Sequence, residues 1–208
     1  MINRSRLSIA LKLILVIANL CLVVIYLSGW TNPQVQSNKK MIVRPRTLVK
    51  QPLEISFEHR GQLAKPNEEF EGDADWLGNL TLKVKNNTNK AITYVLLDLY
   101  FYAQAGTGED QQPTLGLHTI SLGVDPDRKV PAHEFHLAPN ESVEIPLAAR
   151  YKDIKTLVEF RRPVEQVNQM VVRIHDVLFD DGTLFEVSTM YRRNPDPNDL
   201  HKWIKIEN

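Results

Sequence analysis

A long apolar run near the N-terminus constrains this chain more than any other feature of its sequence. Residues 7–27 are mostly apolar, and Lys12 and Asn19 weaken the run most. A transmembrane helix needs about 20 apolar residues, and a lysine near one end can extend its ammonium group to the membrane interface. The run therefore predicts a single membrane-spanning helix, with residues 1–30 forming an N-terminal tail and an anchor.

The alternative is a cleaved signal peptide, which has a shorter apolar core of about 7–15 residues and small residues at its cleavage site. Residues 25–30 are mostly bulky, and Trp30 is typical of a membrane interface. This favours an anchor that is retained. Because Arg4 and Arg6 lie close to the start of the run, the positive-inside rule predicts a cytoplasmic N-terminus and an extracytoplasmic C-terminal part, although basic residues also follow the run.

Charge is balanced over the whole chain but uneven along it. The sequence has 25 basic and 25 acidic residues, so no overall positive field attracts nucleic acid. Residues 31–53 contain no acidic residue and several basic ones, namely Lys39, Lys40, Arg44, Arg46 and Lys50. We expect a polar, basic linker over residues 31–49. The alternative is that this stretch lies on anionic lipid headgroups.

Beyond the linker, the dominant pattern is that of β-strands. Apolar residues alternate with polar ones over residues 53–57, 80–84 and 143–149, which is typical of half-buried strands. Residues 92–103 are apolar on both faces and predict a central strand. Residues 115–119 predict a further strand with the same alternation.

Turn signals separate these strands. Residues 86–90, Asn-Asn-Thr-Asn-Lys, favour a turn because asparagine tolerates positive φ. The Asp-Gly step between the β-branched runs 170–179 and 183–190 predicts a tight hairpin. A short helix is expected over residues 152–162, where a following proline ends it.

Together these elements predict an all-β fold. About seven strands without a long helix indicate an immunoglobulin-like antiparallel β-sandwich over residues 50–192, with a barrel as the structural alternative. Residues 193–208 form a C-terminal tail. Its last apolar residues, 203–206, either add an edge strand or dock against the domain.

Residues 80–102 resemble a known extracytoplasmic domain. Their sequence, LTLKVKNNTNKAITYVLLDLYFY, is similar to the strand–turn–strand core of immunoglobulin-like bacterial surface domains of the FxLYD type, although Ala103 stands where that family has an aspartate. Residues 179–185 and Trp203 likewise resemble the closing hairpin of similar uncharacterised bacterial membrane-anchored proteins. The resemblance implies an accessory or adhesive module and brings no catalytic residue.

Few residues indicate chemistry. His133 and His136 lie three apart around a glutamate, but zinc needs at least one more ligand. An acidic cluster offers carboxylates to calcium without the ligand order of an EF-hand, and its members spaced two apart are Glu69, Glu71, Asp73 and Asp75. The sequence contains neither a Gly-x-Ser-x-Gly elbow nor a phosphate-binding glycine loop. We therefore predict no enzymatic activity, no metal and no cofactor.

Aromatic side chains are the remaining candidates for recognition. Tyr100 and Tyr102 share one face of a predicted central strand, so we expect them to be core residues. Trp76 stands beside the acidic cluster and Trp203 in the tail. We expect these two tryptophans to be more exposed, and so better placed to contact a ligand.

The predicted function is that of a membrane-tethered, single-pass extracytoplasmic sandwich that binds protein without catalysis. Its partners would be the lipid bilayer, through residues 7–27, and another envelope or membrane protein, with no nucleic acid. The expected contact surfaces are the loops 66–78, 104–114 and 123–141. The alternatives are a module that binds carbohydrate or an envelope polymer and, with less support, a hydrolase.

Overall fold

The structure is a computed structural model, and it describes residues 39–46, 51–103, 114–127, 134–196, 198–199 and 201–207. The predicted membrane segment and residues 31–38 of the predicted linker lie outside these ranges. No helix in the described ranges is long and apolar enough to cross a bilayer.

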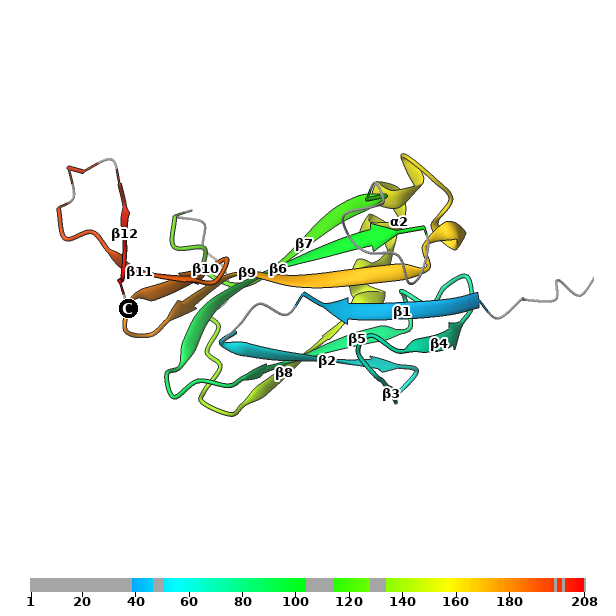
Figure 1. The fold of residues 1–208 in the computed structure, drawn as a ribbon, viewed down its shortest axis with the longest axis horizontal. Helices are drawn as coiled ribbons and strands as arrows, with labels where there is room; N and C mark the ends of the chain where they lie inside the picture. The colour runs from blue at the N-terminus through cyan, green and yellow to red at the C-terminus, as the bar shows by residue number, and fades with distance from the viewer. Residues whose placement is uncertain are drawn as a thin grey trace, which may run out of the picture. The chain divides into compact units, whose positions relative to one another are not determined.

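Regular structure in this part of the chain is mainly β-strand, as Figure 1 shows. The strands are β1 (Lys39–Pro45), β2 (Leu53–His59), β3 (Gln62–Ala64), β4 (Glu69–Gly72), β5 (Leu80–Asn86), β6 (Ile92–Tyr102), β7 (Gly116–Gly123), β8 (Ser142–Pro146), β9 (Gln169–Phe179), β10 (Thr183–Glu186), β11 (Thr189–Arg193) and β12 (Trp203–Lys205). The helical segments are η2 (Leu147–Arg150), α2 (Tyr151–Glu159) and η3 (Val164–Gln166).

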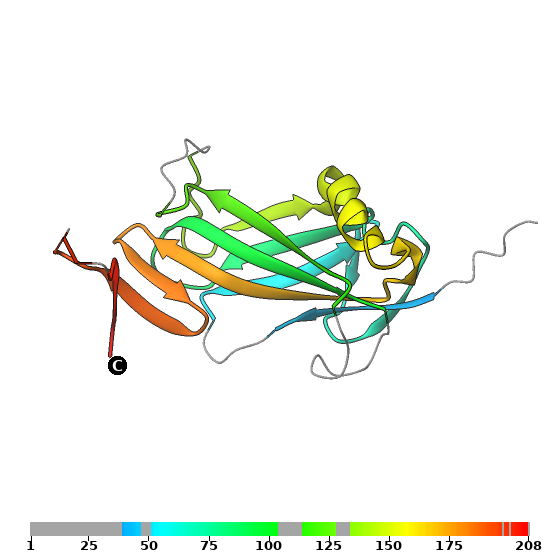
Figure 2. The same ribbon diagram turned by 90° about the horizontal axis from the view of Figure 1, so that it is seen from above.

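The strands form two sheets that face each other (Figures 1 and 2). The smaller sheet has the order β3-β2-β5-β8. In the eight-stranded sheet, β9 pairs along one edge with β6, which pairs in turn with β7. Along its other edge β9 pairs first with β1 and then with β10. Strand β1 pairs on its other side with β4. Strand β10 pairs on its other side with β11, which pairs in turn with β12.

The core lies between the two sheets and follows the alternation of the sequence. Residues of β5 alternate between buried and half-buried along the whole strand. The inward side chains of β6, such as Leu97 and Leu99, are fully buried and belong to one cluster with Leu82 and Val84 of β5. The result is the β-sandwich-like, all-β fold that the strand pattern predicts.

Several local predictions are confirmed. Residues 92–102 form β6, which has a neighbour on each side. The Asp-Gly hairpin joins β9 to β10, and Gly182 has the positive φ of +77° that the turn requires. The predicted short helix is α2, which begins at Tyr151 and ends before Pro163.

The linker prediction is wrong for residues 39–45, which form β1 inside the eight-stranded sheet. Its apolar residues Met41, Ile42 and Val43 are at most 3% exposed, so these side chains are part of the packed structure. The sequence predicted an antiparallel sandwich. The eight-stranded sheet departs from this at one place, because β1 runs parallel to β9. Contacts group β1 with the rest of the described strands in one compact unit, Asn38–Asn208.

Two further boundaries differ from the prediction. The strand predicted over residues 143–149 ends at Pro146, because the chain turns there into η2, which leads to α2. Within the predicted tail, β12 pairs with β11. Of the two alternatives for this tail, the structure therefore contains the edge strand.

The side chain of Asn86 organises the turn between β5 and β6. It is fully buried, and its Nδ2 donates to the carbonyl oxygens of Lys90 at 2.8 Å and Leu137 at 3.0 Å. Its Oδ1 accepts hydrogen bonds from the backbone N and the hydroxyl of Thr88, at 2.9 and 2.8 Å. One asparagine thus satisfies polar groups from both the turn and the segment before β8.

We predict that Asn86→Ala lowers the free energy of unfolding by about 1–3 kcal/mol, because the substitution removes the acceptor of the Thr88 amide and one of the two donors to each of the Lys90 and Leu137 carbonyl oxygens. Asn87→Ala is the matched control, since this neighbouring side chain is exposed and bonds only at 3.3 Å to Glu54; its effect should stay within about 0.5 kcal/mol. Urea unfolding of the full chain in detergent, followed by circular dichroism, measures both. Equal losses in the two variants would contradict the role assigned to Asn86.

Candidate functional site

Helix α2 is held against the eight-stranded sheet by two of its side chains. Ile154 and Val158 are one helical turn apart, both are fully buried, and both belong to the core. The helix ends at Glu159, and Pro163 prevents it from continuing past Arg162, because the residue before a proline is disfavoured in the helical conformation. This places the C-terminal part of α2 beside the beginning of β7.

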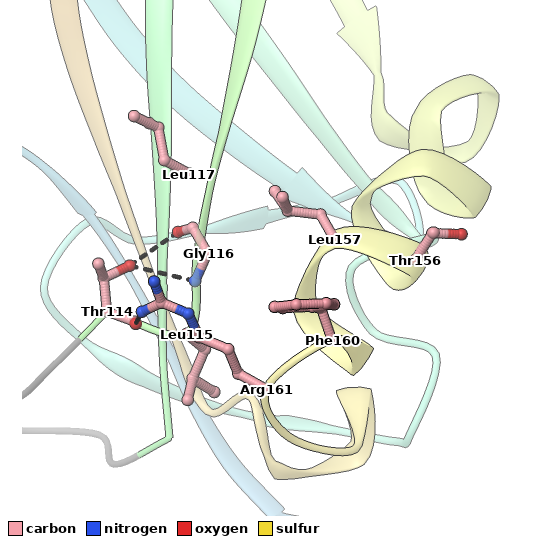
Figure 3. Close-up of a pocket in the computed structure, with 8 residues that line it drawn as sticks. All are labelled: Thr114, Leu115, Gly116, Leu117, Thr156, Leu157, Phe160 and Arg161. Atoms are coloured by element: carbon pink, nitrogen blue, oxygen red, sulfur yellow. Dashed lines mark hydrogen bonds between the residues drawn. The ribbon is translucent and has the colours of Figure 1, made fainter.

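An open groove of about 500 Å³ lies between α2 and β7 (Figure 3). Two segments line it, residues 114–117 on the strand side and residues 156–161 on the helix side. Figure 3 shows Leu117, Leu157 and Phe160 around the opening, with Arg161 reaching back from the helix towards Thr114. The lining is Thr114, Leu115, Gly116, Leu117, Thr156, Leu157, Phe160 and Arg161.

The groove combines an open shape with exposed apolar side chains. Phe160 is 91% exposed, Leu117 is 42% exposed and Leu157 is 36% exposed. Phe160 points away from the stripe of α2 that Ile154 and Val158 form, so packing within the domain does not use it. Exposed aromatic and aliphatic side chains gathered in one concave place are typical of a binding surface.

Hydrogen bonds fix the end of the groove nearest to the start of β7. Arg161 donates from Nη1 to the carbonyl oxygen of Thr114 at 2.8 Å. The hydroxyl of Thr114 donates to the carbonyl oxygen of Gly116 at 2.7 Å and accepts from the Gly116 amide at 3.2 Å. These bonds connect the segment before β7 with the segment that follows α2.

Strand β7 is an edge strand in the described structure. It pairs with β6 and with no other described strand, so one of its edges faces away from the sheet. An unpaired edge offers backbone N–H and C=O groups to another strand. The free edge of β7 therefore adjoins the apolar groove.

Positive charge predominates at the groove. Arg161 is part of the lining, Arg162 is exposed next to it, and Lys155 is paired with Glu159 at 3.7 Å. Deeper between α2 and the sheet, burial and the nearby Arg150 lower the pKa of His118, which favours its neutral form. The charge available to a ligand in the groove is that of the arginines.

The two tryptophans that were expected to be exposed are partly or fully used inside the domain. Trp76 was expected to be exposed, but it is 1% exposed, and its Nε1 donates to the carbonyl oxygen of Val167 at 3.0 Å. Its ring packs edge-on against Phe70. That expectation is wrong, because the turn at residues 73–79 folds its tryptophan into the core. Trp203 is half-buried on β12.

Carboxylates of the acidic cluster form local contacts. Glu69 is paired with Lys40 at 3.0 Å, Asp73 with Arg60, and Asp75 accepts a hydrogen bond from the Tyr151 hydroxyl at 2.8 Å. The partners of these carboxylates lie on separate elements: Lys40 on β1, Arg60 after β2 and Tyr151 at the start of α2. No group of three or more potential metal ligands comes together in the described residues.

The histidine pair and the long loops are described only in part. His136 is exposed, whereas His133 lies outside the described residues, as do residues 104–113 and 128–133. Of the predicted contact loops, Thr114 is therefore the residue that the structure places at the groove. Sequence reasoning missed the helix side of the groove; the available signal was Phe160, an aromatic residue off the apolar stripe of a short helix.

Comparison of the chain with protein-family models, with curated proteins and with solved structures finds no match in any of the three. The groove must therefore be interpreted from its own residues.

We predict that Phe160→Ala leaves the free energy of unfolding within about 0.5 kcal/mol of the parent, because the ring is exposed. Ile154→Ala, on the buried stripe of the same helix, should cost about 2–5 kcal/mol. Urea unfolding of both variants of the full chain in detergent measures the difference. A loss above 2 kcal/mol for Phe160→Ala would show that Phe160 is a packing residue and not a free one.

Proposed function

We propose that this protein is a non-catalytic binding module that captures an extended segment of another protein at the groove between β7 and α2. The observation behind this proposal is that Phe160, Leu157 and Leu117 are exposed around a groove beside β7, one edge of which pairs with no other strand that the structure describes. An extended segment can pair with such an edge through its backbone while its side chains enter the neighbouring pocket.

The chemistry of the groove defines the segment that fits. A bulky apolar side chain would fill the space beside Phe160 and Leu157. A carboxylate next to that side chain would meet the guanidinium groups of Arg161 and Arg162, since arginine binds carboxylates through paired hydrogen bonds. The partner is therefore an extended segment with an apolar residue adjacent to an acidic one.

The setting proposed for this interaction is extracytoplasmic. Residues 7–27 would anchor the chain in the bilayer as a single helix, and the domain would have an immunoglobulin-like topology of the FxLYD type. The partner would then be another envelope or membrane protein. Two observations support the topology: the two facing sheets, and the Asn86–Thr88 turn within the segment that resembles this family.

The groove favours a protein ligand over the carbohydrate or polymer module that the sequence left as an alternative. A sugar-binding platform needs exposed, roughly coplanar aromatic rings, but Trp76 is buried and Tyr102 is 8% exposed. Phe160 is a single ring among aliphatic side chains. This composition suits apolar side chains of a peptide better than a sugar face.

The test is site-specific photo-crosslinking in cells from Thr156, a polar residue on the helix side of the groove. We predict a discrete adduct whose crosslinked peptide is one short segment with the stated chemistry. Phe160→Asp should remove the adduct, whereas Leu63→Asp, on the exposed Leu63 of edge strand β3, should not.

A synthetic peptide of the crosslinked segment then tests the binding mode with the purified full chain. Loss of a central aromatic contact costs about 2 kcal/mol or more, so Phe160→Ala should weaken binding about 30-fold or more. Hydrogen exchange should show new protection of amides in β7. An adduct that survives Phe160→Asp, or a peptide that protects no amide of β7, would falsify the proposal.

A further inference from the structure

The backbone at the start of β7 is already hydrogen-bonded within the domain. The Leu115 amide donates to the carbonyl oxygen of Phe101 at 2.7 Å, and the Gly116 amide donates to the Thr114 hydroxyl at 3.2 Å. The carbonyl oxygen of Gly116 accepts from the same hydroxyl at 2.7 Å. A ligand strand along the outer edge of β7 therefore finds no free amide at residues 115 and 116, and its backbone pairing ends beside Gly116.

Arg161 joins the two sides of the groove at this same end (Figure 3). Its Nη1 donates to the carbonyl oxygen of Thr114 at 2.8 Å, so the guanidinium group reaches from the helix side to the strand side. A ligand chain that continued beyond the start of β7 would have to pass over this side chain, whereas a chain that ends here would not. This end of the groove thus suits a chain terminus better than the middle of a longer segment.

The charge of Arg161 determines which terminus fits. Among the described residues that line the groove, Arg161 is the only charged one. The carboxylates nearest to it in the sequence are Glu159 and Glu165; Glu159 is paired with Lys155 at 3.7 Å, and neither glutamate lines the groove. A guanidinium group has five N–H donors, and the bond to Thr114 uses one of them. These donors favour a carboxylate and disfavour the ammonium group of an N-terminus.

We propose that the groove binds the C-terminal end of its partner protein, with the terminal carboxylate on Arg161 and an apolar last side chain beside Leu157 and Phe160. The inference rests on the proposed function and specifies which part of the partner is bound. The terminal carboxylate is then the acidic group that lies next to the apolar side chain. Guanidinium and carboxylate groups form paired, charge-assisted hydrogen bonds, and capture of a terminal carboxylate is a recurrent mode of peptide recognition.

The position of Arg161 also gives the direction of the bound strand. Strand β7 runs from Gly116 to Gly123, and Arg161 lies at the Gly116 end. A ligand strand whose last residue is beside Gly116 therefore runs antiparallel to β7, as β6 does along the other edge. Antiparallel pairing is slightly more stable per residue than parallel pairing. Leu117, the next residue of β7, then contacts the part of the ligand that precedes its last residue.

The experiment uses the purified full chain in detergent and two bead-displayed pools of random octapeptides. In one pool the peptides end in a free carboxylate, and in the other they end in an amide. The peptides selected from either pool are resynthesised in both forms, and their dissociation constants are measured by fluorescence anisotropy. We expect the acid forms to bind about tenfold more tightly, the equivalent of about 1.4 kcal/mol, and the selected peptides to end in an apolar residue.

Arg161→Gln removes the positive charge but keeps an amide that can donate to the Thr114 carbonyl, so it should bring the acid and amide forms to within about twofold of each other. Lys152→Gln is the matched control. Lys152 is exposed on the same helix and does not line the groove, so this variant should keep the full preference. If Arg161→Gln loses both forms, Arg161→Lys takes its place and, because it keeps the charge, should retain the preference for the acid form.

Equal binding of acid and amide forms by the parent chain, or a preference that Arg161→Gln leaves unchanged, overturns the inference. If such binding is still weakened by Phe160→Ala, the groove remains a site for internal segments and the proposed function stands. Failure of both pools to bind in a Phe160-dependent way removes the proposed function, and the inference with it. In cells, the segment crosslinked from Thr156 should contain the last residue of the partner, and an internal segment there contradicts the inference alone.

Discussion

Strand β9 determines most of this architecture, because it must satisfy backbone groups along both of its edges. One edge is filled by β6 over nearly its whole length. The other is shared end to end by β1 and β10. A long buried strand with an unpaired edge would leave N–H and C=O groups without partners. Strand β1 and the C-terminal hairpin are therefore both parts of one sheet.

The periodic signals predicted the elements well, since alternation and tight turns depend on neighbouring residues. The 170–190 hairpin and the strands beginning at Leu53, Leu80 and Ile92 all form as expected. The predicted linker failed at residues 39–45 for a different reason. Met-Ile-Val between basic residues is too short a signal to reveal a strand, and its partners Gln169–Val172 lie more than 120 residues away in the chain.

The candidate site was less predictable than the fold. Thr114 fell within an expected contact loop, but the rest of the groove exists because α2 packs beside β7, a contact between distant segments. Trp76 shows the opposite error, since it was predicted to be an exposed contact residue and is buried. Its acidic neighbours indicate exposure, whereas the structure buries its indole ring beneath the turn and uses its N–H for the Val167 carbonyl. Local polarity does not reveal where a turn folds back on the core.

The position of β1 also defines how this domain would bear mechanical force. A pull on Lys39 along the strand axis loads the backbone bonds between β1 and both of its neighbours in shear, so that these bonds share the tension. The load then passes through β9 and β6 to β7. A ligand strand on β7 that is pulled along its axis would be sheared likewise, whereas one pulled sideways from an end would unzip bond by bond. The direction of tension would then govern how long the partner stays attached.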